Sequence, residues 1–91
     1  MPWREHFHDA VVVVTGASSG IGRATAIAFG AAGARVVLVA RRRDELEEVA
    51  REIRASGAVA LVIPADVTSA HAVRDVLEET LRQHGRVDVV I

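Results

Sequence analysis

A glycine-rich segment near the start of the chain has the composition of a ligand-binding turn. It comprises residues 15–22, Thr-Gly-Ala-Ser-Ser-Gly-Ile-Gly, and lies between the apolar run 11–14 and an alanine-rich helical pattern. The start of a helix presents unpaired backbone N–H groups and the positive end of the helix dipole, and glycines remove the Cβ atoms that would keep a phosphate away from them. The segment therefore predicts a phosphate site, the plainer alternative being an ordinary strand-to-helix turn.

The glycine spacing limits which nucleotide this turn could bind. A phosphate-binding P-loop ends in Gly-Lys-Ser/Thr, but this chain has no lysine, because all 11 of its basic Lys and Arg positions are arginines. The common Gly-x-Gly-x-x-Gly fingerprint needs glycines two and then three residues apart, and here they stand at Gly16, Gly20 and Gly22. The spacing argues against mononucleotide hydrolysis and indicates a different dinucleotide fingerprint.

The pattern Thr-Gly-x-x-x-Gly-x-Gly resembles the short-chain dehydrogenase/reductase (SDR) family, whose members transfer hydride between NAD(P) and an alcohol or carbonyl group. The resemblance implies that Gly16 makes the tight turn and that Ser18 and Ser19 reach the adenosine-side phosphates. It further implies that Ile21 lies along the pyrophosphate and the nicotinamide ribose. The cofactor-binding set that it implies in this segment is Gly16, Ser18, Ser19, Gly20, Ile21 and Gly22.

Arginines after the second apolar run favour NADP over NAD. In dinucleotide-binding folds an acid at the end of the second strand binds the ribose 2′-hydroxyl, while a basic residue accepts a 2′-phosphate. Here Ala40 occupies that position and Arg41 and Arg42 follow, so we expect both to contact a 2′-phosphate. The alternative is that these arginines only solvate the start of a helix, although cations there oppose its dipole. At position 19 the chain departs from the pattern of NADP-preferring relatives, because many of them also carry a basic residue there and this chain has Ser19.

A second marker of the family is Asp66-Val67, which follows the third apolar run. In the resembling family this aspartate hydrogen-bonds the adenine amino group, and the backbone of the next residue contacts the ring. The alternative is that Asp66 caps the helix that follows. Together with the glycine segment, the pair indicates an adenine site.

Strands and helices are predicted to alternate along the chain. β-branched runs predict strands over residues 11–14, 36–40, 58–63 and 87–91, and helical periodicity predicts helices over 21–32, 43–56 and from a cap at Thr68 or Ser69 to 84. Right-handed crossovers then give a parallel sheet in the order 3-2-1-4, with the switch point between the first and fourth strands beside the glycine segment. The predicted fold is α/β, the first part of a Rossmann-type doubly wound sheet.

Each predicted helix has an expected buried face. On the first helix these residues are Ala24, Ala28 and Phe29. The second and third helices show the spacing of an amphipathic stripe. Its members are Leu46, Val49, Ala50 and Ile53 on the second helix, and Val73, Val76, Leu77, Thr80 and Leu81 on the third.

Composition excludes several classes of function. The formal charge is −1, which argues against general affinity for nucleic acid or for an anionic membrane, and no apolar run is long enough to span a bilayer. The chain has no cysteine, and residues 1–10 are too polar for a signal peptide, so we expect a soluble, cytoplasmic protein. His6 and His8 lack the company of a metal site, so no metal is predicted, and His71 and His84 are expected to be solvated.

The chain carries the cofactor half of the resembling family but not its catalytic half. Residues 1–10 are expected to be an extension and 11–91 an NAD(P)-binding domain. The family continues with an Asn-Asn-Ala-Gly segment, a catalytic serine and a Tyr-x-x-x-Lys pair, whereas this chain contains neither tyrosine nor lysine. We expect the NADP-binding portion of an oxidoreductase that is a homo-oligomer at full length. The alternative is a stand-alone, non-catalytic dinucleotide-binding or sensing module.

Overall fold

The computed structural model describes residues 7–91, which form alternating strands and helices. In chain order the elements are β1 (Val11–Thr15), α2 (Gly20–Ala31), β2 (Arg35–Ala40), α3 (Arg43–Ala55), β3 (Val59–Pro64), α4 (Ala70–His84) and β4 (Val89–Val90). Element types and order are as predicted, and β4 is shorter than the predicted strand. Backbone hydrogen bonds on both sides of β4, from Asp88 N–H to the Val11 carbonyl and from Ile91 N–H to the Val13 carbonyl, extend its contact with β1.

The four strands form one parallel sheet in the order β3-β2-β1-β4, which confirms the predicted order. β1 is central and pairs with β2 and β4, so that Val13 lies beside Val37 on one side and Val90 on the other. Strands covered on both faces of a parallel sheet are continuous apolar runs in the sequence, and the four valines of β1 are all buried.

Because the strands are parallel, the carboxyl ends of β1, β2 and β3 lie at the same end of the sheet.

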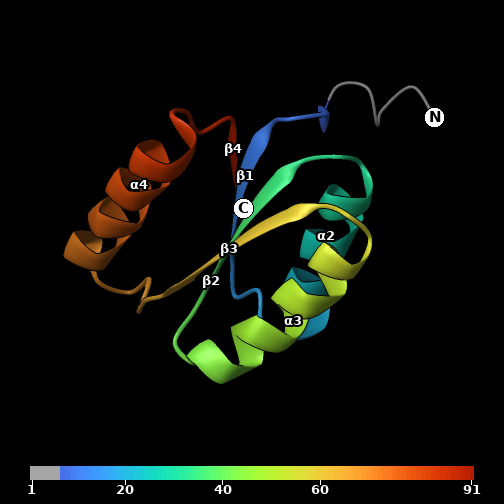
Figure 1. Cartoon of the computed structure of the whole chain (residues 1–91). Helices are drawn as coiled ribbons and strands as arrows, with labels where there is room; N and C mark the ends of the chain where they lie inside the picture. Colours follow the sequence, from blue (N-terminus) through green and yellow to red (C-terminus); the bar gives the residue numbers. More distant parts are fainter. Residues whose placement is uncertain (1–6) are drawn as a thin grey trace.

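Helices cover both faces of the sheet, with α2 and α3 on one side and α4 on the other (Figure 1). Because successive strand residues point to opposite faces, Val12 and Val14 pack with α2 and α3 while Val11 and Val13 pack with α4. The predicted stripe of α3 is buried in full. The first of these two cores is the larger one, and it consists of Val12, Val14, Ala17, Ala26, Ala34, Val36, Leu38, Leu46, Val49, Ala50, Ile53, Ala60 and Val62.

The buried face of α2 differs from the predicted one. Ala24 and Ala28 are exposed, whereas Ala26 and Gly30 are buried. The reason is the close packing of α2 on α3, since a Cβ at Gly30 would lie 2.9 Å from Ile53 Cγ2. Phe29 is half-buried against the core, and its ring meets that of Phe7 edge to face with centroids 5.0 Å apart.

α4 begins and packs as its polar and apolar residues dictate, with one exception. Of the two candidate caps Ser69 is the one used, because its Oγ accepts a hydrogen bond from the Ala72 N–H at 3.2 Å. Val76 and Thr80 are buried, but Leu81 keeps 49% of its surface exposed, contrary to prediction. Within residues 7–91, α4 is the only helix on its face of the sheet, so the outer part of its stripe has nothing to pack on.

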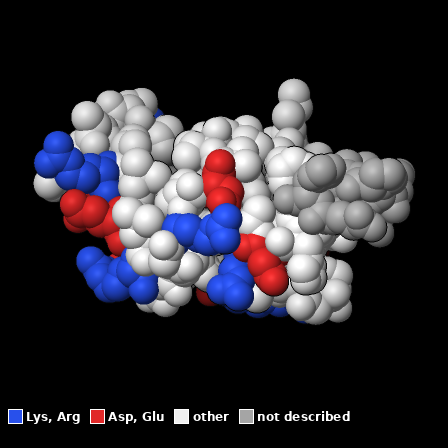
Figure 2. Space-filling view, turned by 90° about the horizontal axis from the view of Figure 1, so that it is seen from above, with Lys and Arg blue, Asp and Glu red and all other residues white. Residues whose placement is uncertain are grey.

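The surface carries both signs of charge. On the face seen in Figure 2, arginine atoms lie beside aspartate and glutamate atoms rather than gathering into a patch of one sign. Such mixing provides no extended basic surface on this face for a polyanion. In the described part of the chain, no helix combines the length and the apolar character that crossing a membrane requires.

His84, at the end of α4, is not solvated as predicted. It is half-buried, and its Nε2 atom is fully buried with no hydrogen-bond partner among the described residues. Burial, and secondarily the charge of Arg35, lower the pKa of His84 below its ordinary value of 6.5. The neutral imidazole is therefore the form that fits this end of the fold.

The burial of His84 predicts a loss of stability in mild acid. In the unfolded chain His84 takes up a proton near its ordinary pKa, whereas the folded chain resists protonation until lower pH, so stability is full above that ordinary pKa and falls as the pH drops through it. We expect the free energy of unfolding, measured by urea denaturation, to decrease from about pH 7.5 to about pH 5.5. His84→Gln should reduce this decrease. His71→Gln, on the exposed side of the same helix, is the control, and an equal change in both variants would contradict the assignment.

Candidate functional site

The glycine segment lies at the carboxyl edge of the sheet, at the switch point between β1 and β4. Its first residue, Thr15, donates its backbone N–H and its hydroxyl to the Ile91 carbonyl at 2.8 and 2.7 Å. Ala17 is buried and donates its N–H to the Val39 carbonyl at 3.2 Å, which ties the turn to β2. The turn is thus held by both neighbours of β1, at the place where open α/β sheets bind ligands.

The turn requires glycine at specific positions. Gly16 and Gly20 have φ values of 62° and 58°, in the left-handed region that glycine adopts at little cost. At Gly22 the constraint is contact, because a Cβ would lie 2.7 Å from the Gly16 carbonyl carbon and closer still to its oxygen. The Gly16 position itself faces open space, with nothing within 4 Å of a Cβ built there. The turn therefore leaves room beside its backbone for another group.

The first turn of α2 has the properties of an anion site. Its N-cap residue, Ser19, makes no side-chain capping hydrogen bond, and no acidic residue lies in the first turn. The orphan N–H groups and the positive end of the dipole are therefore not compensated by the chain itself. Ser19 and Gly20 are exposed, and Ile21 has 87% of its surface exposed, so this helix start is accessible to a ligand.

A cavity of about 330 Å³ opens beside the turn, between the ends of β2 and β3. It brings together residues from three segments far apart in sequence, including six of the ten predicted site residues. The remaining four, residues 19–22, lie on the adjoining start of α2 rather than in the cavity wall. The lining residues are Gly16, Ser18, Ala40, Arg41, Arg42, Glu45, Ala65, Asp66, Val67 and Thr68.

Asp66 is positioned by Thr68. Its Oδ1 accepts hydrogen bonds from the Thr68 hydroxyl at 2.6 Å and from the Thr68 N–H at 3.0 Å, so Asp66 closes a local turn and Ser69 caps α4. These hydrogen bonds, with a smaller contribution from the Arg41 guanidinium, lower the pKa of Asp66 below its ordinary value. The carboxylate is therefore ionised at neutral pH and can accept a further hydrogen bond.

Each of the two predicted arginines of the cavity wall lies near an acidic side chain. Arg41 Nη2 is 3.8 Å from Asp66 Oδ1, and Arg42 Nε is 3.9 Å from Glu45 Oε1 and 4.0 Å from Asp44 Oδ1. Both guanidiniums are mostly exposed and free to reorient toward a ligand. Sequence reasoning missed Glu45 because its spacing marks only the first turn of a helix, and missed the role of Thr68 in holding Asp66.

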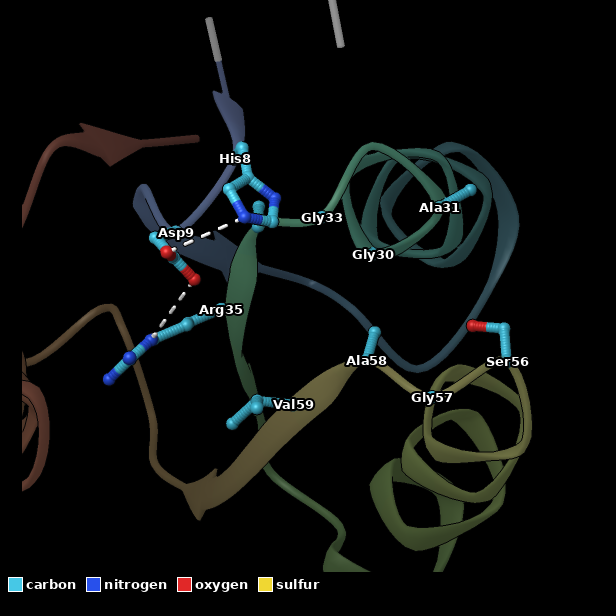
Figure 3. Close-up of a pocket in the computed structure, with 11 residues that line it drawn as sticks. His8, Asp9, Gly30, Ala31, Gly33, Arg35, Ser56, Gly57, Ala58 and Val59 are labelled. Atoms are coloured by element: carbon cyan, nitrogen blue, oxygen red, sulfur yellow. Dashed lines mark ion pairs between the residues drawn. The ribbon is translucent and has the colours of Figure 1, made fainter. Parts of the chain in front are cut away.

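A second cavity, of about 390 Å³, lies at the opposite end of the sheet, where β2 and β3 begin (Figure 3). Asp9 there stands between His8 and Arg35, at 3.6 and 4.0 Å, and Gly33 and Gly57 mark the ends of α2 and α3. Helix carboxyl ends present carbonyl oxygens and the negative end of the dipole, which repel phosphate. Despite its larger volume, this cavity is not suited to a dinucleotide.

The described residues contain no cluster of three or more histidine, cysteine or acidic side chains that could hold a metal ion. Within residues 7–91, Asp9 is the only such group that His8 contacts, and His6 lies outside the described residues. The site described above is therefore built from backbone N–H groups, hydroxyls, arginines and carboxylates.

Comparison with known proteins gives one consistent family. Residues 10–91 match the short chain dehydrogenase family. Among curated relatives, an uncharacterized oxidoreductase of Listeria innocua is 41% identical over 82 residues, which cover 90% of this chain and 33% of that protein. The 11-beta-hydroxysteroid dehydrogenase-like 3 protein of Arabidopsis thaliana is 42% identical, over 94% of this chain and 29% of its own length.

Solved structures agree in fold as well as in sequence. A short-chain type dehydrogenase/reductase from Mycobacterium marinum superposes with a TM-score of 0.89 at 39% identity, covering 92% of this chain and 34% of that one. A metagenomic short-chain oxidoreductase in complex with NADP gives a TM-score of 0.88 at 44% identity, covering 92% and 38%. The chain spans about a third of the length of the curated relatives it matches. Because the family model matches residues 10–91 and solved members of the family superpose on 92% of the chain, the chain belongs to the short chain dehydrogenase family.

Proposed function

We propose that this chain is the NADP-binding portion of a short-chain dehydrogenase/reductase, an oxidoreductase that transfers hydride between NADP(H) and an alcohol or carbonyl compound. One observation carries the proposal: a cavity at the carboxyl edge of the sheet, between an uncompensated helix start and two arginines. Residues 11–91 are the proposed dinucleotide-binding domain, preceded by an extension over residues 1–10.

The pyrophosphate is proposed to lie on the start of α2. Gly16 and Gly20 would expose backbone N–H groups there, Gly22 would allow the helix to begin against the turn, and Ser18 and Ser19 would donate hydroxyl hydrogen bonds. The exposed Ile21 would cover the pyrophosphate and the nicotinamide ribose. When bound, the nicotinamide ring supplies the hydride chemistry, and the residues of this chain bind and orient the cofactor.

The adenosine is proposed to occupy the cavity between β2 and β3. Ionised Asp66 would accept a hydrogen bond from the adenine amino group, and the backbone of Val67 would contact the ring. Ala40 offers no carboxylate to a ribose 2′-hydroxyl, while Arg41 and Arg42 line the same wall and can form charge-assisted hydrogen bonds to a 2′-phosphate. NADP in the metagenomic relative is consistent with this choice.

The first prediction concerns cofactor preference. Because hydrogen bonds to charged groups contribute about 1.5 to 3 kcal/mol each, we expect NADP to bind at least about tenfold more tightly than NAD. Arg41→Ala should narrow that ratio, as measured by calorimetric titration. Arg43→Ala, a neighbouring charge that is absent from the cavity wall, should leave it unchanged. Equal affinities for the two cofactors in the unmutated protein would contradict the proposal.

A second prediction separates binding from folding at the glycine turn. Gly16 and Gly57 both have positive φ and nothing within 4 Å of a built Cβ, but only Gly16 lines the proposed site. Gly16→Ala and Gly57→Ala should each lose about 1 to 2 kcal/mol of stability by thermal or urea unfolding. Only Gly16→Ala should also lose dinucleotide affinity, by at least about tenfold. Full affinity in a folded Gly16→Ala protein would show that no phosphate approaches this backbone.

A third prediction concerns catalysis. Proton transfer to or from the substrate oxygen needs a positioned acid or base, and the tyrosine and lysine that provide it in the family do not occur in residues 1–91. We expect these residues alone to bind NADPH without oxidising it in the presence of a panel of carbonyl compounds, followed by absorbance. Turnover by pure, monomeric 91-residue chain would refute this division of roles.

A further inference from the structure

The wall of the proposed adenosine cavity contains an acid with no assigned role. Glu45 lies in the first turn of α3, is half-buried, and lines the cavity together with Arg41, Arg42 and Asp66. The formal charges of these four side chains cancel. The cavity therefore does not present the net positive charge that its two arginines alone would give.

Each arginine of the wall faces one of the two acids. Arg41 is 3.8 Å from Asp66, and Arg42 is 3.9 Å from Glu45, so a 2′-phosphate entering the cavity competes with a carboxylate for either guanidinium. It also meets the carboxylates themselves at short range. Solvent weakens both the competition for the guanidiniums and the repulsion by the carboxylates, since the arginines are mostly exposed. Both effects nevertheless disfavour binding of a phosphate.

The two acids differ in how they are held. Asp66 accepts two hydrogen bonds from Thr68 and so keeps its position whether or not Arg41 turns away. Glu45 makes no hydrogen bond within residues 7–91, and its ion pair there is with Arg42. Removal of the Glu45 charge would therefore take away the acidic partner of Arg42 in the cavity wall and leave it with Asp44, at 4.0 Å, outside that wall. The turn that orients Asp66 would not be disturbed.

We propose that Glu45 is a specificity-determining residue that reduces the preference of this site for a 2′-phosphorylated nucleotide, by pairing with Arg42 and by repelling the phosphate. The proposal rests on the proposed function, because it assigns the adenosine end of the cofactor to this cavity. In consequence the ratio of the affinity for 2′-phosphorylated nucleotides to the affinity for nucleotides with a free 2′-hydroxyl is smaller than the arginines alone would give.

Binding of two small probes tests the proposal without need for catalysis. 2′,5′-ADP carries the 2′-phosphate and 5′-AMP carries a free 2′-hydroxyl, and calorimetry would give the affinity of each for the unmutated protein and for Glu45→Gln. We expect Glu45→Gln to bind 2′,5′-ADP about threefold to fivefold more tightly, with the affinity for 5′-AMP unchanged. The gain should shrink as salt is added, because the pair is partly exposed.

Glu48→Gln is the matched control, since it removes the same charge from an exposed position on the same helix outside the cavity wall. If the unmutated protein prefers 2′,5′-ADP but Glu45→Gln and Glu48→Gln behave alike, the role of Glu45 is overturned while the proposed function stands. Weaker binding of 5′-AMP by Glu45→Gln would overturn it differently, by showing that Glu45 binds the ribose. Binding of neither probe to the unmutated protein would contradict the proposed function and this inference with it.

Discussion

The arrangement of the site depends on one close approach of backbone to backbone. Gly22, in the first turn of α2, lies against the Gly16 carbonyl so closely that no Cβ fits between them. This contact lets the helix begin directly beyond the end of β1, with its N–H groups at the carboxyl edge of the sheet. It also sets the path of α2 toward α3, where Gly30 continues the close packing. The absence of side chains, rather than their presence, thus determines where the positive end of the helix lies.

Around that helix start, charge is balanced rather than concentrated. Arg41 and Arg42 would favour a phosphate, while Asp66 and Glu45 stand within about 4 Å of them. Because these side chains are substantially exposed, each ion pair contributes little by itself. Under the proposed function, the choice between NADP and NAD would be the sum of several small competing interactions. Asp66 differs from the others because Thr68 fixes it in place and keeps it ionised. Under the proposed function, an acid held by two hydrogen bonds beside exposed guanidiniums would allow one cavity to bind both the adenine and the 2′-phosphate of a nucleotide.

Much of this site could be predicted from residue types and spacing. Gly16, Ser18, Arg41 and Asp66 were expected at one edge, and the structure brings them to one cavity because parallel strands end together there. Their contacts with a cofactor remain predictions. Glu45 and the role of Thr68 were not anticipated, since their importance comes from the distance between side chains on different segments. A glutamate in the first turn of a helix satisfies the helix dipole and gives no sign that it also faces a ligand cavity.

The sequence by itself determined the order of elements, the strand order and the buried stripe of α3, because apolar periodicity and crossover handedness depend on local spacing and chirality. Tertiary structure decided which face of α2 is buried, and it chose the small residues Ala26 and Gly30 because the helix lies close to Ile53. It also left Leu81 exposed and placed His84 Nε2 in a buried position. Periodicity shows which side chains prefer to be inside, but only the distance to a neighbouring element decides how much room they have.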